Sequence, residues 1–257
     1  MANGKELDIL FKARKINKSF GDFKANIDID ISIKKGEIHA LLGENGAGKS
    51  TLVKIFYGVL KHDSGTIEIN NQLINISSPQ SARKNGVGMV FQHFSLFPAL
   101  TVAENILIAL DQKIGFQRLI SDIRKLSKEW DLFIDPLRLI SDLSVGERQR
   151  VEIIRCLMQN PKLLIMDEPT SVLTPQEIEN LFKILKRLSK SGCSILYISH
   201  KLEEIIELAN QVTILKSGRC VSTLNAKTTS TKELAETMVG KKITKLKKNN
   251  IKNNKTV

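Results

Sequence analysis

The segment at residues 43–51, GENGAGKST, constrains the fold of this chain more than any other. It follows an apolar run, IHALL, that is typical of a buried strand, and it precedes LVKIFYGVL, which is typical of a helix. The spacing Gly43-x-x-x-x-Gly48-Lys49-Ser50 fits a phosphate-binding loop between a strand and a helix. The alternative is a glycine-rich turn that happens to carry a lysine.

The residue types of this loop suit the phosphates of a nucleotide. Glycines let the backbone curl so that successive N–H groups point at phosphate oxygens, and the following helix adds the positive end of its dipole. Lys49 supplies a full charge, and Ser50 supplies a hydroxyl ligand for Mg²⁺. We therefore expect the loop to bind a nucleoside triphosphate. The expected contacts are Gly43, Glu44, Asn45, Gly46, Ala47, Gly48, Lys49, Ser50 and Thr51.

An acidic pair follows another apolar run in LLIMDEPT. Asp167 would emerge beside the loop and hold Mg²⁺, directly or through water. Glu168 would point the other way in an extended chain, and Pro169 favours that extended geometry. We expect Glu168 to be the general base that activates an attacking water. The alternative is a solvated acidic pair at the end of a strand.

Hydrophobic patterning places the loop in an α/β fold. DIDISIKKGEIHALLG and GTIEINNQLIN alternate with period two, and the second predicts a turn at Asn70-Asn71, which indicates an antiparallel layer. GVGMVFQ, KLLIMDE and CSILYISH are short apolar runs separated by helical segments, which indicates a parallel sheet. QVTILKSGRCVSTL predicts a hairpin that turns at Ser217-Gly218.

Two helix starts can be predicted from their capping residues. TPQEIENLFKILKRL places Thr174 at the N-cap, Pro175 at the first helical position and Glu177 where it completes a capping box. SVGERQRVEIIRCL places Ser144 at the N-cap and Glu147 three residues later. Both segments are expected to begin as helices at these residues.

The domain organisation follows from pattern and charge. The almost wholly helical pattern between Gln92 and Asn160 predicts an inserted helical subdomain at about 93–160, inside a domain that covers 1–240. The chain has a net charge of +12, and residues 241–257 carry seven lysines and no acid. We expect this tail to be solvated and disordered, with loose attraction to anionic lipid or RNA as the alternative. No aromatic residues interleave its lysines, so no specific nucleic-acid partner is expected.

The sequence argues against a membrane-spanning protein, a secreted protein and a protein built on disulfides or a cysteine metal site. No apolar run approaches the roughly 20 residues that a membrane-spanning helix needs, and the N-terminus lacks the pattern of a signal peptide. The cysteines Cys156, Cys193 and Cys220 are odd in number and far apart, which argues against a disulfide framework or a metal site. We therefore expect an intracellular chain with reduced cysteines.

Five motifs occur in the order found in ABC ATPases: the phosphate loop, FQ at Phe91-Gln92, LSVGE from Leu143, LLIMDEPT, and ISH ending at His200. The chain resembles this family over roughly residues 9–240. The resemblance implies a P-loop NTPase with a RecA-like parallel-sheet core, an antiparallel β subdomain and an inserted helical subdomain. It also implies an ATPase with ATP and Mg²⁺ as cofactors.

The resemblance assigns roles to individual residues. Gln92 resembles the glutamine that reaches Mg²⁺ and senses the γ-phosphate, and His200 resembles the switch histidine that contacts the γ-phosphate. Phe20 matches the aromatic residue that stacks on adenine, with Phe23 as the alternative. The implied catalytic residues are Glu168, His200 and Lys49, and the implied metal ligands are Ser50, Gln92 and Asp167.

The segment LSVGE resembles the family's signature motif. A capped helix start can receive an anion, because its N–H groups are unsatisfied and its dipole favours negative charge. In this family the anion is the γ-phosphate of ATP on the other nucleotide-binding domain, so that two domains sandwich two ATPs. The residues expected to contact the partner domain's ATP are Ser144, Val145, Gly146 and Glu147. SVG replaces the more usual SGG, and no reactive group is lost.

Three stretches of the sequence indicate which branch of the family the chain resembles. GMVFQHFSLFPALTVAENI, VGERQRVEI and DEPTSVLTPQE look like the ATPases of nucleoside importers, and the last is also similar to sugar importers of the ribose and galactose type. The implied partners are a second nucleotide-binding domain, permease subunits docked near Gln92, and an extracytoplasmic substrate-binding protein acting through the permease. The implied location is the inner face of the cell membrane, on its cytoplasmic side, as a peripheral subunit.

Two further classes remain as alternatives: a soluble ABC ATPase acting on ribosomes or nucleic acid, and an iron–sulfur assembly ATPase. The importer-like stretches count against both, and no long coiled coil or zinc module separates the motifs. Relatives in the importer groups usually carry two nucleotide-binding domains in one longer chain. Pairing with itself and pairing with a separate domain therefore both stay open.

Overall fold

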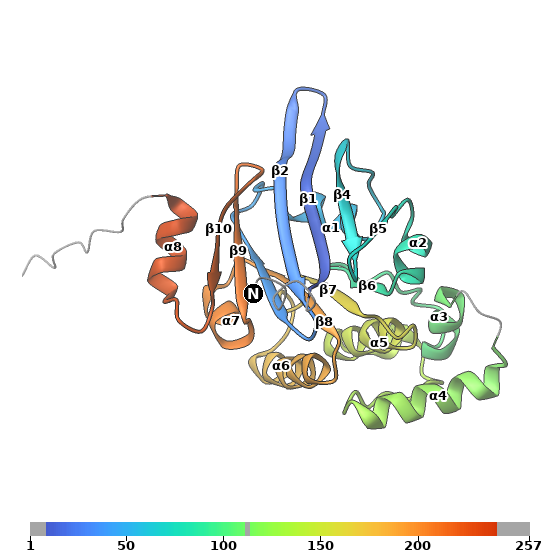
Figure 1. The fold of residues 1–257 in the computed structure, drawn as a ribbon. Helices are drawn as coiled ribbons and strands as arrows, with labels where there is room; N and C mark the ends of the chain where they lie inside the picture. The colour runs from blue at the N-terminus through green and yellow to red at the C-terminus, as the bar shows by residue number, and fades with distance from the viewer. Residues whose placement is uncertain (1–8, 111–113, 241–257) are drawn as a thin grey trace, which may run out of the picture.

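The computed structural model describes residues 9–110 and 114–240, and Figure 1 shows its two sheets with the helices around them. The lysine-rich segment at 241–257, for which the sequence predicts a disordered tail, lies outside the described residues. Within the described part of the chain, no helix is long and apolar enough to cross a membrane.

The larger sheet has six strands in the order β10-β9-β3-β8-β7-β6. Its strands are β3 (Ile38–Leu42), β6 (Val87–Val90), β7 (Leu163–Asp167), β8 (Ser194–Ser199), β9 (Gln211–Lys216) and β10 (Arg219–Asn225). All pairs are parallel except β9 with β10, which turn at Ser217 and Gly218 with φ of 48° and 75°. Every residue of β3, β7 and β8 is buried, as in strands covered on both faces. The predicted parallel sheet and hairpin are confirmed.

The smaller sheet is antiparallel, in the order β2-β1-β4-β5. Its strands are β1 (Ile9–Phe20), β2 (Phe23–Lys34), β4 (Ser64–Ile69) and β5 (Gln72–Ile74). Asn70 and Asn71 join β4 to β5 with φ of 51° and 60°, the left-handed values of a type I′ turn, which asparagine tolerates. The predicted antiparallel layer and its turn are confirmed.

Helices follow most of the strands. They are α1 (Lys49–Phe56), α2 (Pro79–Lys84), α3 (Val102–Ala109), α4 (Phe116–Glu129), α5 (Val145–Leu157), α6 (Pro175–Lys190), α7 (Leu202–Leu208), α8 (Thr231–Val239) and a short 3-10 helix at Ile140–Asp142. Between β6 and β7 the described elements are all helical, and Figure 1 shows α3 and α4 to one side of the larger sheet. The boundaries of a helical subdomain at about 93–160 and of the whole domain at 1–240 stay predictions.

Alternate residues of the central strands build a core on each face of the larger sheet. On β7, Leu163 and Ile165 pack with α1 and the smaller sheet, whereas Leu164 and Met166 pack with α5 and α6. Helix α1 therefore lies between the two sheets, and α5 and α6 cover the opposite face. This arrangement brings the start of α1 to the carboxyl ends of the parallel strands.

The two predicted helix starts are confirmed. The Thr174 side chain accepts a hydrogen bond from the backbone N–H of Glu177, and the Glu177 carboxylate accepts one from the backbone N–H of Thr174. Ser144 and Glu147 make the same reciprocal pair at the start of α5. Both helices thus begin where their capping boxes predict.

Candidate nucleotide-binding site

The phosphate loop joins β3 to α1 and is held from two sides. The Asn26 side chain donates to the carbonyl oxygen of Gly48 at 3.1 Å, and the Gly218 N–H donates to the carbonyl oxygen of Ala47 at 3.1 Å. Gly48 has a φ of 101°, and a Cβ there would overlap the carbonyl oxygen of Ala25. The loop is thus tied to β2 and to the β9–β10 turn, and its closest contact with β2 requires glycine.

The start of α1 is open to an anion. Its N-cap residue is Gly48, which offers no side-chain cap, and no acidic residue lies in the first turn. The first N–H groups of the helix therefore have no side-chain acceptor, and the helix dipole favours negative charge at this end. This geometry fits the phosphates of a nucleotide.

The side chain of Lys49 lies on the loop itself. Its ammonium group is buried and donates to the carbonyl oxygens of Gly43 at 2.7 Å and Glu44 at 3.1 Å. Burial lowers the pKa of Lys49, whereas the charges of Glu168 and Asp167 raise it. The structure therefore brings the loop lysine and the acidic pair within electrostatic range of each other, as the sequence predicts.

Asp167 is the last residue of β7 and is buried. Burial raises the pKa of its carboxyl group, the charge of Glu168 raises it further, and Lys49 opposes both effects. The two other expected metal ligands, Ser50 and Gln92, are exposed.

Together, the three expected ligands offer a carboxylate, a hydroxyl and an amide oxygen, which are the donors that Mg²⁺ prefers. Neither at this site nor anywhere else do the described residues contain a group of three or more His, Cys, Asp or Glu side chains that could hold a metal on their own. The residues therefore fit a magnesium site that oxygens of the nucleotide or of water would complete.

The backbone of Glu168 corrects an expectation from the sequence. Pro169 was expected to favour extended geometry at Glu168, but Glu168 has a φ of 46°, in the left-handed region. Its N–H donates to the carbonyl oxygen of Ile198 on β8 at 3.1 Å, and its carbonyl oxygen accepts from the Ser171 N–H at 3.3 Å. Contacts with the neighbouring strand and the following turn thus outweigh the local preference set by proline.

The Glu168 carboxylate lies between two other predicted residues. Gln92 donates from Nε2 to one oxygen at 3.3 Å, and Nδ1 of His200 lies 3.3 Å from the other. These residues follow β6, β7 and β8, whose carboxyl ends meet at one edge of the sheet. Gln92, Glu168 and His200 therefore form one cluster, although they are far apart in sequence.

A buried acid, Glu204, binds residues that lie close in sequence to this cluster, and it was not identified from the sequence. Glu204, on α7, accepts hydrogen bonds from Thr170 and Tyr197, each at 2.7 Å, and from Ser199 at 3.0 Å. Burial acts to raise the pKa of Glu204, but hydrogen bonds, together with the ammonium of Lys201 at 3.1 Å, outweigh it and lower the pKa. The only signal in the sequence is an acid in the first turn of a helix, which does not reveal its distant partners.

Two phenylalanines lie at the turn between β1 and β2. Phe20 and Phe23 face each other across this turn, with exposed fractions of 48% and 62%. The ammonium of Lys18 lies 5.5 Å from the centroid of the Phe20 ring. Strand β2 begins at Phe23, and its residues Ala25 and Asn26 contact Gly48 of the loop. Adenine stacking by Phe20 stays a prediction.

The signature residues lie at the start of α5. Ser144 and Val145 are exposed, whereas Gly146 is buried against the Glu177 carboxylate, where a Cβ would overlap it. Glu147 is also paired with Arg138 at 2.6 Å. Among the described residues, no hydrogen bond or ion pair joins this helix start to the phosphate loop of the same chain. Contact with a partner domain's nucleotide stays a prediction.

Residues 27–171 match a protein family described as ABC transporter. The nucleoside import ATP-binding protein NupA of Lactococcus lactis subsp. cremoris is 45% identical over 232 residues, covering 89% of this chain and 46% of NupA. The ribose import ATP-binding protein RbsA of Geobacillus kaustophilus is 40% identical over 243 residues, covering 90% of this chain and 48% of RbsA. The chain spans about half the length of these curated relatives.

Solved structures share the fold over most of this chain. The cbiO1 protein of Clostridium perfringens, part of the ABC transporter complex cbiONQ, is 31% identical with a TM-score of 0.76, covering 90% of this chain and 93% of cbiO1. An ATP-binding cassette of an ABC transporter in its ADP conformation is 27% identical with a TM-score of 0.77, covering 89% of this chain and 94% of the cassette. The predicted α/β fold with a P-loop NTPase core is confirmed.

Proposed function

Because this chain belongs to the ABC transporter family, we propose that it is the ATP-hydrolysing subunit of an import system that carries nucleosides. The observation that best supports ATP hydrolysis is the Glu168 carboxylate, which lies between Gln92 and His200 within electrostatic range of the loop lysine. A solvated acidic pair at a strand end would not have both oxygens of one carboxylate engaged in this way.

The phosphates of ATP would lie over residues 43–51, where Lys49 and the open start of α1 provide positive charge. The adenine ring would stack on Phe20 at the β1–β2 turn. Mg²⁺, held by Ser50, Gln92 and Asp167, would neutralise negative charge on the phosphate oxygens.

Hydrolysis would then depend on the cluster around Glu168. The carboxylate accepts a proton from the water that attacks the γ-phosphate, and Gln92 and His200 keep it in position. Lys49, whose ammonium donates to backbone carbonyl oxygens of the loop in this structure, would donate to phosphate oxygens as negative charge redistributes in the transition state. The chain's own residues thus bind the phosphates, orient the water and take up its proton.

The exposed start of α5 would complete the site of a second nucleotide-binding domain. Within the described residues, no hydrogen bond or ion pair joins Ser144 or Gly146 to the phosphate loop of their own chain, which agrees with a role on a partner's ATP. Light scattering of Glu168→Gln protein, with and without Mg-ATP, tests the pairing. An ATP-dependent dimer would mean self-pairing, and an ATP-binding monomer would mean that the partner domain belongs to another chain.

The choice of nucleosides rests on relatives, because the cargo of an importer does not touch this subunit. NupA, named for nucleoside import, is 45% identical, and RbsA, named for ribose import, is 40% identical. Sugars of the ribose and galactose type are therefore the second candidate. Permease subunits docked near Gln92 and an extracytoplasmic substrate-binding protein are the proposed partners, which would place the chain at the inner face of the membrane.

Uptake measurements test the cargo and the role of Glu168 together. Cells that lack the gene should take up labelled nucleoside slowly, and wild-type protein but not Glu168→Gln should restore the rate. Labelled ribose and galactose serve as comparison cargoes in the same cells. Restored sugar uptake with unchanged nucleoside uptake would favour the second candidate, and no change in any uptake would contradict the import proposal.

A further inference from the structure

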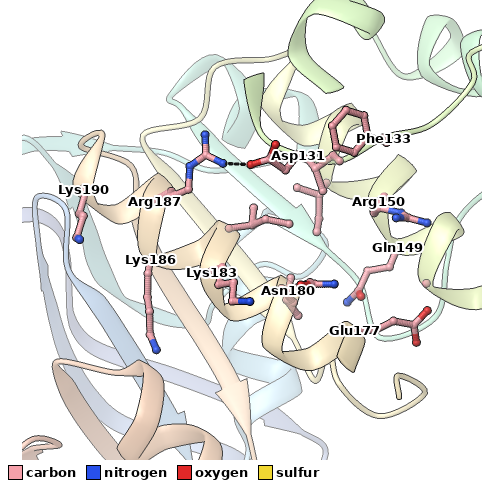
Figure 2. Close-up of a pocket in the computed structure, with 15 residues that line it drawn as sticks. Asp131, Phe133, Gln149, Arg150, Glu177, Asn180, Lys183, Lys186, Arg187 and Lys190 are labelled. Atoms are coloured by element: carbon pink, nitrogen blue, oxygen red, sulfur yellow. Dashed lines mark hydrogen bonds and ion pairs between the residues drawn. The ribbon is translucent and has the colours of Figure 1, made fainter. Parts of the chain in front are cut away.

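A cavity of about 690 Å³ lies between α6 and the segment that runs from the end of α4 into α5 (Figure 2). Small-molecule sites in proteins typically have volumes of about 300–1,000 Å³. Its lining includes none of the phosphate-loop residues, and none of Gln92, Asp167, Glu168 or His200. The cavity is therefore separate from the phosphate site, although its edge reaches Gly146 of α5.

The floor of the cavity is apolar. Leu132, Ile153, Leu181 and Ile184 line it, and all four side chains are buried. Phe133 lies at the rim, where its ring is 63% exposed to solvent (Figure 2). An exposed phenyl ring beside buried aliphatic side chains offers a contact surface for the apolar body of a ligand.

The polar part of the lining is mostly basic. It contains five basic and two acidic side chains: Arg150, Lys183, Lys186, Arg187, Lys190, Asp131 and Glu177. Figure 2 shows Arg187 paired with Asp131, and Lys186 pairs with Glu207 at 3.2 Å. The cavity therefore carries an excess of positive charge that its own acids do not balance.

Three of these cations form no ion pair within residues 9–110 and 114–240: Arg150, Lys183 and Lys190. The Arg150 guanidinium donates no hydrogen bond to those residues either, and its Nε atom is buried. Buried donors without an acceptor are uncommon in native proteins, because each costs free energy to desolvate. Figure 2 shows Arg150 on the α5 side of the cavity and Lys183 on α6. An anionic group is the partner that the Arg150 guanidinium, with its buried Nε atom, lacks.

We propose that this cavity binds a small amphipathic anion, which has an aromatic or aliphatic body and one carboxylate, sulfonate or phosphate group. The body would lie against Phe133 and the apolar floor, and the acidic group would pair with Arg150. The exposed Lys183, on α6, would add positive charge on another side of the cavity. An acidic segment of a partner protein is the competing occupant, and the limited volume favours a small molecule.

Anilinonaphthalene sulfonate (ANS) is a suitable probe, because its fluorescence rises when its rings leave water. We expect the full chain, with excess ADP to fill the nucleotide site, to bind ANS at one saturable site. Phenylnaphthylamine has the same rings without the sulfonate and should bind about tenfold more weakly, since hydrogen bonds to charged groups are among the stronger ones. Equal affinity for the two probes would show that the cavity does not select an anion.

Matched variants locate the bound probe. Phe133→Ser and Lys183→Glu should each weaken ANS binding by about tenfold or more. Phe97→Ser, with a ring that is 58% exposed, and Lys125→Glu, on the exposed face of α4, lie outside the cavity and should leave binding unchanged. All four changed residues are exposed or partly exposed, so the variants should fold, which circular dichroism checks.

Unchanged binding in both cavity variants would place the probe elsewhere and overturn the proposal. Equal losses in cavity and control variants would do the same, because they would indicate non-specific adsorption. Failure to find any saturable ANS site would leave an acidic protein segment as the better occupant and would contradict a small-molecule site. None of these measurements depends on ATP hydrolysis or on transport.

Discussion

Nδ1 of His200 lies 3.3 Å from one carboxylate oxygen of Glu168, and the two residues follow the adjacent parallel strands β8 and β7. Gln92, beyond the end of β6, donates to the other carboxylate oxygen at 3.3 Å. Ligands of open α/β sheets bind at the carboxyl ends of the strands, where these three side chains meet. This position, beside the phosphate loop, favours a catalytic carboxylate over a solvated acid.

We expect Glu168→Gln to bind ATP as the wild type does and to hydrolyse it at least about a hundredfold more slowly, because general-base catalysis contributes about 10²–10⁴-fold. The amide keeps the size of the side chain but cannot take up a proton. Phosphate release measures turnover, and calorimetry measures nucleotide affinity. Glu207→Gln, an exposed acid on α7, is the control. Wild-type turnover in Glu168→Gln would place the general base elsewhere.

Lys49→Ala should weaken ATP binding by tenfold or more, since hydrogen bonds to charged groups contribute about 1.5–3 kcal/mol. The segment at residues 43–51 has no other basic residue, so no other side chain of the loop can replace the charge of Lys49. Fluorescent-nucleotide titration measures the affinity. Lys54→Ala, at an exposed position of the same helix, should bind ATP as the wild type does. Equal affinities for Lys49→Ala and wild type would exclude the loop lysine from phosphate binding.

Two glycines of the loop should respond differently to alanine. Gly46 has a φ of 81° and open space around a Cβ, so Gly46→Ala should cost only the strain of left-handed geometry, about 1–2 kcal/mol. Gly48 has a φ of 101°, and a Cβ would overlap the backbone of Ala25, so Gly48→Ala should reduce the free energy of unfolding by more. Urea denaturation compares the two variants. Equal losses in the free energy of unfolding for the two variants would mean that the backbone of β2 at Ala25 shifts at little cost to accommodate the added Cβ.

Much of the fold could be predicted because local patterns determine it. The capping boxes at Thr174 and Ser144 use residues three positions apart, and the turns at Asn70 and Ser217 use residues that tolerate left-handed geometry. The buried strands carry continuous apolar runs, which is typical of a parallel sheet covered on both faces. Each of these signals lies within a few residues of the feature that it predicts.

Features of the site that depend on distant partners could not be predicted in the same way. The left-handed backbone of Glu168 follows from its hydrogen bond to Ile198 on another strand, which no local rule for proline contains. The network around Glu204 includes Thr170, which is separated from it in sequence by α6 and β8, and Tyr197 on β8. The grouping of Gln92 with His200 was implied only by resemblance to the family.

Glu204 should make stability depend on acidic pH. Burial alone would raise its pKa, but hydrogen bonds from Tyr197, Thr170 and Lys201 outweigh burial, so the pKa in the folded protein lies below its ordinary value of 4.5. A carboxyl group of this kind contributes stability that is complete above its unfolded-state pKa and is lost as pH falls through the folded-state pKa.

Between about pH 6 and pH 3 the wild type should therefore lose free energy of unfolding more steeply than Glu204→Gln, because the amide does not titrate in this range. Urea denaturation at several pH values measures both slopes, and all other titrating groups are common to the two proteins. Glu203→Gln, at the neighbouring position on α7, should keep the wild-type slope. Parallel curves for wild type and Glu204→Gln would mean that folding does not lower the pKa of Glu204.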